Sequence, residues 1–318
     1  MELPVTNFYA RELDAQRVLA CTPAPGRALW LLVQARKGGY RVVRIVADGE
    51  GGTVRTEWQL GGGAEHFEGA LVAAGGSRAY VVAFNVDDRG ISAHCTVAAV
   101  LRVGDGGVTR VSPDTVWGSS LYAAHTLTRM ASGADRAYVE HDGSVVSDQE
   151  EVCRVGQGGG GRVWECVALM YRDGEVVYTS YERVFVLEPN LVAREEVAVQ
   201  NHYVEHTDVT GDNWLYVTEA PRKRPAPVGS PGYVITVYSH GQRLLRARMG
   251  TSQPAAFVTE QVMVRLEDGG AVKLDLDTRR EGCLVPPCGL CELRKADGFL
   301  VLRGEVAGGS FRLFGVLA

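Results

Sequence analysis

The chain has 318 residues, of which 46% are hydrophobic, and its formal net charge is −5 at pH 7. This hydrophobic content supports a large packed core, while the negative charge argues against general binding to nucleic-acid phosphates, which normally needs a strongly basic surface. No run of 18 apolar residues is present, so no membrane-spanning segment is expected.

The N-terminal segment MELPVTNFYARELD carries acidic residues at positions 2 and 12 and has no apolar stretch of secretory length. It therefore does not resemble a signal peptide, and the cytoplasm is the expected location. Residues 8–20 (FYARELDAQRVLA) are the best candidate for a helix. Arginine outnumbers lysine 29 to 4, which fits either a GC-rich genome or a thermophilic source.

One strand-like phrase recurs seven times along the chain. Each copy begins with a polar or Gly/Asp-rich turn and continues as an aromatic and β-branched run, which is typical of a turn that leads into a buried strand. Named by their central apolar residues, the copies are GRALWLLV (Trp30), SRAYVVAF (Tyr80), DRAYVE (Tyr138), ERVFVL (Phe185), NWLYVT (Tyr216), EQVMVRL (Met263) and DGFLVLRG (Leu300).

These copies recur every 45 residues on average, with further strand-like runs between them and almost no helical periodicity. A repeat of this length built from strands is typical of the blades of a β-propeller. The sequence therefore predicts an all-β chain that forms one domain over residues 1–318, a propeller with seven blades. Six or eight blades, or two β-sandwiches, are the alternatives.

The two ends of the chain fit a closed ring. After the Leu300 copy only GEVAGGSFRLFGVLA remains, which leaves the last blade without an outer strand. The N-terminal LPVTNFYA can supply that strand and hide the open edges. The chain resembles the β-propeller superfold in general, but it lacks the WD and GH dipeptides, the kelch di-glycine set and the tryptophan motifs of PQQ-type propellers.

Histidines precede three of the seven copies at comparable distances. Since the innermost strand of a blade precedes the strand that carries the copy, His66, His125 and His206 are predicted to converge on the axis. Three imidazoles can bind a divalent metal and leave an open position for water or substrate. Some propeller lyases and lactonases hold a metal there, so the resemblance implies a metal-dependent enzyme as one alternative. The other alternative is that the histidines only line a wet channel.

Three of the seven cysteines cluster in CLVPPCGLC, as Cys283, Cys288 and Cys291. They can provide part of a zinc site, form a disulfide, remain structural thiols or act as a redox-active pair, and the sequence does not decide between these. The position of Cys288 and Cys291 upstream of the Leu300 copy places them at the channel or its rim.

The segment EAPRKRPAPVGSPG at 219–232 is proline-rich and contains Arg222, Lys223 and Arg224. It joins two strands of one blade, and function concentrates on loops of this kind that a rigid scaffold holds. A solvated long hairpin is the simpler interpretation.

These features support three hypotheses. The first is a non-catalytic scaffold that binds a protein partner through rim loops, in particular Arg222–Arg224. The second is a metal-dependent enzyme with its site at His66, His125 and His206. It is the only one of the three hypotheses that requires a cofactor, a divalent metal. The third is a ribonucleoprotein component, with nucleic acid contacting only the basic loop. The sequence identifies neither the partner, nor a substrate, nor the oligomeric state.

Overall fold

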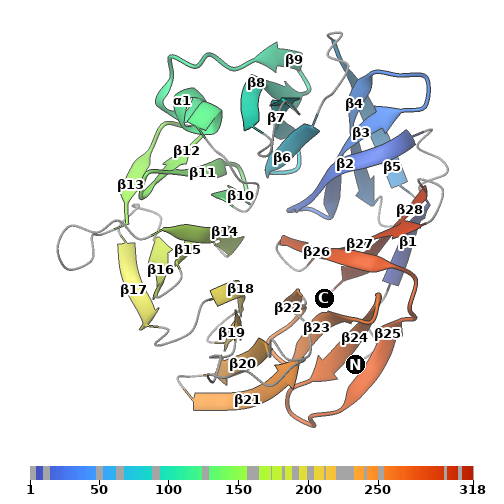
Figure 1. Cartoon of the computed structure of the whole chain (residues 1–318), viewed down its shortest axis with the longest axis vertical. Helices are drawn as coiled ribbons and strands as arrows, with labels where there is room; N and C mark the ends of the chain where they lie inside the picture. Colours follow the sequence, from blue (N-terminus) through green and yellow to red (C-terminus); the bar gives the residue numbers. More distant parts are fainter. Residues whose placement is uncertain are drawn as a thin grey trace.

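In the computed structural model the chain forms seven four-stranded antiparallel sheets around a central axis (Figure 1). The all-β class and the seven-bladed propeller predicted from the sequence are confirmed, and the sandwich alternative is excluded. The structure describes residues 5–9, 15–47, 53–61, 68–87, 94–123, 129–155, 165–172, 174–180, 183–187, 193–198, 204–210, 213–219, 233–239, 242–249, 254–296, 299–306 and 310–317.

We number the sheets as blades 1 to 7 and give the strands of each blade from the axis outward. Blade 1 contains β2 (Ala15–Ala24), β3 (Ala28–Ala35), β4 (Tyr40–Ala47) and β5 (Thr53–Leu60). Blade 2 contains β6 (Glu68–Ala74), β7 (Arg78–Asp87), β8 (His94–Gly104) and β9 (Gly107–Arg110). Blade 3 contains β10 (Met130–Ser132), β11 (Ala137–His141), β12 (Ser144–Ser147) and β13 (Val152–Arg154).

The remaining four blades follow the same plan. Blade 4 contains β14 (Cys166–Arg172), β15 (Glu175–Ser180), β16 (Arg183–Leu187) and β17 (Ala193–Ala198). Blade 5 contains β18 (Val204–Thr210), β19 (Asn213–Glu219), β20 (Tyr233–Ser239) and β21 (Gln242–Met249). Blade 6 contains β22 (Ala255–Phe257), β23 (Val262–Glu267), β24 (Gly270–Asp275) and β25 (Glu281–Val285). Blade 7 contains β26 (Leu290–Ala296), β27 (Phe299–Val306), β28 (Ser310–Leu317) and β1 (Val5–Tyr9).

The innermost strands contact one another around the whole axis. Each of β2, β6, β10, β14, β18 and β22 touches the innermost strand of the next blade, and β26 of blade 7 touches β2 of blade 1 (Figure 1). At the outer side of blade 7, β1 pairs antiparallel with β28, with Val5 opposite Val316 and Tyr9 opposite Arg312. One sheet thus contains strands from both ends of the described chain.

Six of the seven recurring phrases lie on the second strand of a blade. These strands are β3, β7, β11, β19, β23 and β27. Phe185 is the exception, because it lies on β16, the third strand of blade 4. The second strand there is β15, whose sequence EVVYTS is also aromatic and β-branched and also follows an Asp-Gly pair. The alignment on Phe185 was therefore wrong, since two adjacent strands carry the same pattern.

The predicted helix over residues 8–20 is also wrong. Residues 15–24 form β2, which pairs with β3 through two register irregularities and buries Ala15, Val18 and Cys21. A helix occurs instead at α1 (Val116–Ala123), between β9 and β10. It is the one helix in the described ranges and has eight residues, so none of the described helices is long and apolar enough to cross a membrane.

α1 is fixed by its cap and by two side chains of its inner face. The Thr115 hydroxyl accepts a hydrogen bond from the Gly118 amide at 2.9 Å, which satisfies one of the free donors of the first turn. A Cβ at Gly118 would lie 2.0 Å from the carbonyl oxygen of Ser112, so only glycine fits there. Trp117 and Leu121, four residues apart, pack into the core between blades 2 and 3.

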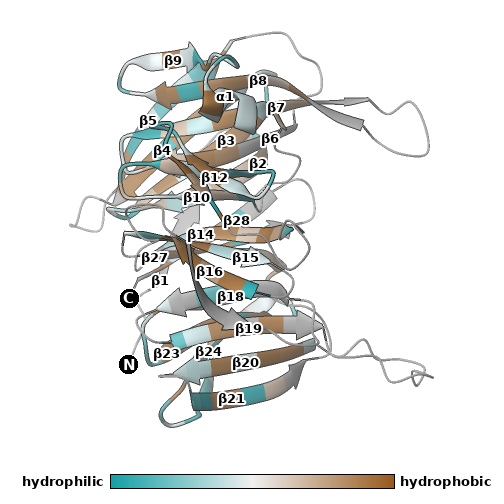
Figure 2. Ribbon diagram, turned by 90° about the vertical axis from the view of Figure 1, so that its left-hand side faces the viewer, coloured by the Kyte–Doolittle hydropathy of each residue, from teal (hydrophilic) through white to brown (hydrophobic). Residues whose placement is uncertain are grey.

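The hydrophobic core is divided into seven clusters, and each cluster lies between two adjacent blades. The strand β3 shows how the sequence produces this. Its alternating residues point to opposite faces, so Leu29 and Leu31 pack towards blade 7 while Trp30 and Leu32 pack towards blade 2. Both faces of the sheet are buried, and β3 is therefore apolar from Ala28 to Val33. Figure 2 shows hydrophobic residues along the strands and hydrophilic ones at many turns.

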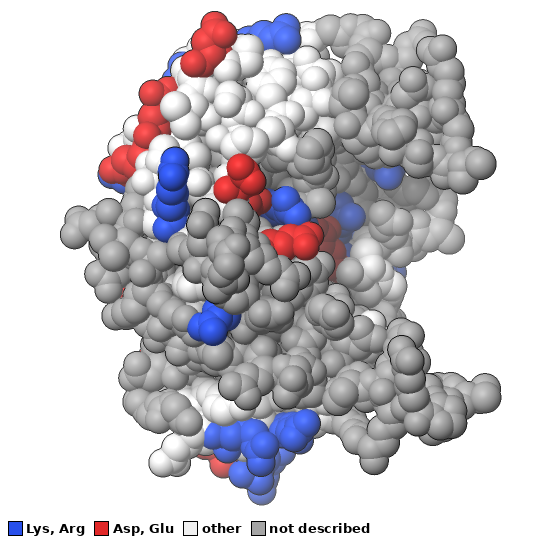
Figure 3. All heavy atoms as spheres, turned by 60° about the vertical axis from the view of Figure 1, so that its left-hand side comes forward, with Lys and Arg blue, Asp and Glu red and all other residues white. Residues whose placement is uncertain are grey.

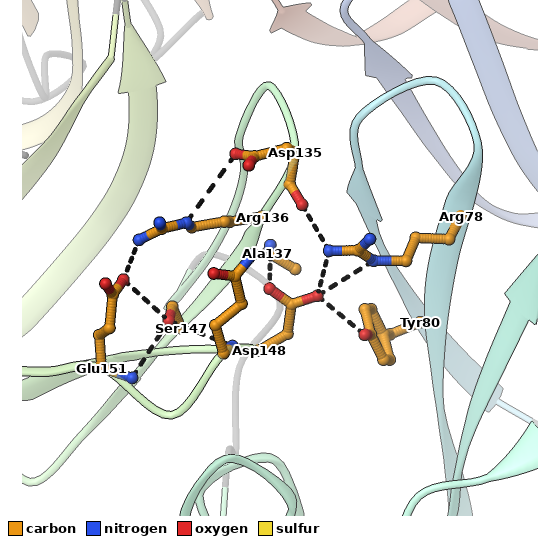
Figure 4. A network of polar contacts seen from close by, with 9 residues as sticks. Arg78, Tyr80, Asp135, Arg136, Ala137, Ser147, Asp148 and Glu151 are labelled. Atoms are coloured by element: carbon orange, nitrogen blue, oxygen red, sulfur yellow. Dashed lines mark hydrogen bonds and ion pairs between the residues drawn. The ribbon is translucent and has the colours of Figure 1, made fainter.

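A polar network joins blades 2 and 3 (Figure 4). Asp148, whose side chain is 1% exposed, accepts hydrogen bonds from Arg78 Nη2 at 3.0 Å and from the Tyr80 hydroxyl at 2.8 Å. Its other oxygen accepts from the Ala137 amide at 3.1 Å. Burial, together with the Asp148 carboxylate, raises the pKa of Tyr80 to about 12, so this hydroxyl stays protonated and donates.

The backbones of the same two blades approach closely beside this network. The Gly75 amide donates to the Gly133 carbonyl at 3.0 Å. A Cβ at Gly75, where φ is +63°, would lie 2.2 Å from the Ala134 carbonyl oxygen. Glycine is therefore required at this contact, and the polar network and the apolar cluster hold the two blades together.

Packing between blades predicts the effect of a core truncation. Leu31→Ala removes a fully buried side chain between blades 1 and 7 and is expected to lower the free energy of unfolding by about 2–5 kcal/mol, from lost burial and the cavity left behind. Urea denaturation measures this. The control Val54→Ala, at a side chain 58% exposed on β5, is expected to stay within about 0.5 kcal/mol. Equal effects of the two variants would contradict the assigned packing.

The network predicts a second stability effect. Asp148→Ala leaves the Arg78 and Tyr80 donors without their common acceptor, and we expect a loss of about 3 kcal/mol in the same urea experiment. Asp135→Ala is the matched control, because that side chain is 73% exposed and its one ion pair among the described residues is with Arg136 at 3.9 Å. A loss below about 1 kcal/mol for Asp148→Ala would show that the network does not hold the two blades.

Candidate functional site

The structure describes only some of the predicted site residues. His66, His125, Arg222, Lys223 and Arg224 lie outside the described residues. The backbone of His206 lies on β18, an innermost strand, opposite Val217, whereas its side chain is not described. The metal site and the basic loop thus remain predictions.

The cysteine cluster is described in full. Cys283 lies on β25, Cys291 lies on β26, and Cys288 lies in the connection between these strands; all three are free thiols. Within the described ranges no three His, Cys, Asp or Glu side chains are grouped as metal ligands would be. Cys291 faces the axial cavity described next, where its position upstream of the Leu300 copy had placed it.

A cavity of about 290 Å³ lies at the axis, between the innermost strands of blades 7, 1, 2 and 3. The strands β2, β6 and β10 supply a largely apolar wall that includes Leu19, Leu71, Val72 and Met130. The opposite wall comes from β26 and β27 and carries charged side chains. We call this space the axial cavity.

The charged wall is a chain of one carboxylate between two guanidinium groups. Glu292 Oε1 lies 2.8 Å from Arg294 Nε, and Glu292 Oε2 lies 2.8 Å from Arg303 Nε. Arg303 Nη1 also donates to the Val18 carbonyl of β2 at 3.3 Å, which connects blade 7 to blade 1. The two guanidinium groups and one carboxylate sum to a single positive charge.

The local sequence explains this arrangement. Glu292 and Arg294 are two residues apart on β26, so they share a face of the strand. Arg303 lies directly opposite Glu292 in the β26–β27 pairing, where side chains of opposite charge interact across strands. The alternation in CELRKA was a visible signal in the sequence, but its partner Arg303 is identified only once the register is known.

The buried thiol of the cavity is not a nucleophile at neutral pH. Burial is the main cause that raises the pKa of Cys21 to about 12; the Glu292 carboxylate also raises it, whereas Arg303 and Arg294 act in the opposite direction. Burial likewise raises the pKa of Cys153 and of Cys166. Because the thiolate is the reactive form, these side chains act as buried apolar groups rather than as catalytic cysteines.

A second ion pair links the innermost strands on the other side of the axis. Lys295 Nζ of β26 lies 3.0 Å from Asp208 Oδ2 of β18, and the Phe257 amide of β22 donates to the same oxygen at 2.6 Å. Asp208 is 5% exposed. The buried Asp208 carboxylate of blade 5 thus joins blades 5, 6 and 7 at the axis, because it binds a backbone amide of blade 6 and a lysine side chain of blade 7.

The outer edge of blade 5 is basic and exposed. Arg243, Leu244 and Arg246 are exposed on β21, which pairs with β20 alone in its sheet. Arg279 and Arg280, exposed between β24 and β25, lie beside it, since Arg279 Nη2 donates to the Leu244 carbonyl at 3.5 Å. Figure 3 shows basic side chains gathered at the lower end of the molecule, where β21 lies in Figure 1. We call these five residues the basic edge.

No family model and no curated protein matches the sequence. The shape is similar to that of BamB from Moraxella catarrhalis, with a TM-score of 0.52 at 12% identity over 99% of this chain and 98% of that chain. It is also similar to the β-propeller domain of the Trilobed protease from Pyrococcus furiosus, with a TM-score of 0.50 at 9% identity over 97% and 94% of the two chains. These structural similarities show that the propeller fold is shared. At sequence identities this low they show nothing beyond the fold.

The thiol environments predict an order of alkylation. At about pH 8 iodoacetamide should modify the exposed Cys283 and Cys291 at least about tenfold faster than the buried Cys21, because burial suppresses both access and thiolate formation. Peptide mass spectrometry over time measures the rates, and protein unfolded in urea, where all three should react alike, is the control. Comparable rates for Cys21 and Cys291 in the folded protein would contradict the burial of Cys21.

Proposed function

We propose that this protein is a non-catalytic propeller that binds an acidic segment of a protein partner at the rim of blade 5. The observation that carries the proposal is the basic edge, where Arg243, Arg246 and Arg280 have no carboxylate partner among the described residues. On β5, by contrast, Arg55 pairs with Glu57, so its charge is largely balanced within the blade.

The local geometry also suits a partner chain. β21 is the outermost strand of its described sheet, so backbone groups on its outer side, apart from the Leu244 carbonyl that Arg279 contacts, can pair with an added strand. Leu244, 38% exposed, supplies an apolar contact between two arginines. An acidic segment can therefore combine backbone pairing with charge complementarity.

The chain sequence adds support from the same blade. The connection between β19 and β20 spans residues 220–232, whereas the equivalent connection in blade 6, between β23 and β24, spans two residues. It contains Arg222, Lys223 and Arg224. Blade 5 thus carries both the longest such elaboration and the basic edge, and long loops on rigid scaffolds commonly bind partners.

An acidic protein is favoured over nucleic acid as the partner. The net charge of −5 opposes the long-range field that phosphate binding normally uses. A protein segment needs only a local match, because backbone pairing and Leu244 contribute to its affinity.

Fluorescence anisotropy with a labelled oligoglutamate peptide tests the proposal. The double variant Arg243→Glu/Arg246→Glu should weaken binding at least about tenfold, because each reversal replaces attraction by repulsion. The matched control Arg110→Glu/Arg154→Glu makes the same charge change at exposed positions on β9 and β13 and should change affinity less than about threefold. Melting temperatures of both variants should stay within a few degrees of the wild type.

Three outcomes would contradict the proposal. Equal weakening by both double variants would show that only total charge matters. Tighter binding of a single-stranded RNA of similar length would favour the ribonucleoprotein hypothesis instead. Unchanged binding by Arg243→Glu/Arg246→Glu, together with strong weakening by reversal of Arg222–Arg224, would move the contact from the basic edge to the loop.

A further inference from the structure

The two walls of the axial cavity differ in polarity, and the proposed scaffold function assigns no role to this cavity. One wall is largely apolar, with Leu71 and Val72 from β6 and Met130 from β10, although Thr22 and Ser132 add two hydroxyl groups to it. The opposite wall carries Glu292 and Arg294 of β26. Its volume of about 290 Å³ is close to the lower end of the range for small-ligand pockets. A molecule that is charged at one end and aliphatic at the other matches both walls.

The charged wall selects the sign of the ligand. Each oxygen of Glu292 lies 2.8 Å from a guanidinium Nε, so two cations already balance the charge of this carboxylate. Arg294 uses its Nε for Glu292, and for its Nη1 and Nη2 the described part of the chain provides no hydrogen-bond or ion-pair partner. The side chain is 40% exposed and lines the cavity.

Arg294 is also held in place before any ligand arrives. Its contact with Glu292 fixes the guanidinium plane, and Glu292 is itself fixed by Arg303, which is connected to the Val18 carbonyl. A preorganised guanidinium loses little conformational entropy on binding and can offer its terminal nitrogens to a planar two-oxygen acceptor. A carboxylate fits this geometry.

The charge balance limits the ligand to one negative charge. The three side chains together carry a single positive charge, and a dianion placed beside Arg294 would also lie close to the Glu292 carboxylate. Phosphate in its doubly charged form is therefore disfavoured relative to a carboxylate.

We propose that the axial cavity is a binding site for a small monocarboxylate with a short aliphatic chain, whose carboxylate binds Arg294 and whose chain lies against Leu71, Val72 and Met130. Cys21 and Cys291 line the same space without taking part in chemistry. This site is independent of the basic edge, because it lies at the axis and not at the rim, so the two proposals can fail separately.

Isothermal titration calorimetry with hexanoate, 1-hexanol and inorganic phosphate tests the site. Hexanoate should bind with a measurable Kd, and 1-hexanol, which has the same chain without the charge, at least about tenfold more weakly. Phosphate should also bind more weakly than hexanoate. If 1-hexanol or phosphate binds as well as hexanoate, or if hexanoate does not bind, the proposal is overturned.

Variants locate the binding. Arg294→Gln should weaken hexanoate at least about tenfold, and Arg294→Lys should give an intermediate loss, because it keeps the charge but not the paired donors. Arg312→Gln, at an exposed arginine on β28, is the matched control and should leave the Kd unchanged. Circular dichroism verifies that each variant is folded; if Arg294→Gln is unfolded, the Lys variant alone decides. Binding that is the same in the wild type and the folded Arg294 variants would overturn the assignment.

Discussion

The fold depends on the packing of each blade against its two neighbours. A four-stranded sheet of this length has two apolar faces and cannot bury either of them alone. In this chain the alternating residues of the second strand serve opposite neighbours, as Leu31 and Trp30 do on β3. The seven core clusters correspond to the seven junctions, including the one between blade 7 and blade 1. Removal of any one junction would expose two faces at once.

The same constraint places the polar groups. Two buried carboxylates lie where blades meet, Asp148 between blades 2 and 3 and Asp208 among blades 5, 6 and 7. Each is satisfied by donors from more than one blade, which removes the cost of burying an unpaired charge. The axial cavity follows from this pattern, because Arg303 bridges blade 7 to β2 and thereby positions Glu292 and Arg294 at the axis.

The seven-bladed architecture could be predicted from the sequence because the second strand of each blade is buried on both faces. Such a strand needs a continuous apolar run, which is visible in the sequence. Phe185 was misplaced because β15 and β16 are equally apolar, and position within a blade cannot be told from composition. The helix expected at residues 8–20 was wrong because pairing with β3 overrides a weak local preference. The charged wall was not predicted, because Glu292 and Arg303 become partners only through the strand register. The basic edge was missed for a related reason: exposure of β21 depends on its outer position in the sheet.

The most direct test of the ring is a double-mutant cycle across the junction where blade 7 meets blade 1. Leu31 of β3 and Leu313 of β28 belong to one core cluster although they are 282 positions apart in the chain. The free energies of unfolding of both alanine variants and of the double variant give their coupling energy. A closed ring predicts a coupling of about 0.5–3 kcal/mol, as for residues in one packed cluster. Additivity within about 0.3 kcal/mol would show that the two blades do not pack together, and would contradict the ring on which both proposed sites depend.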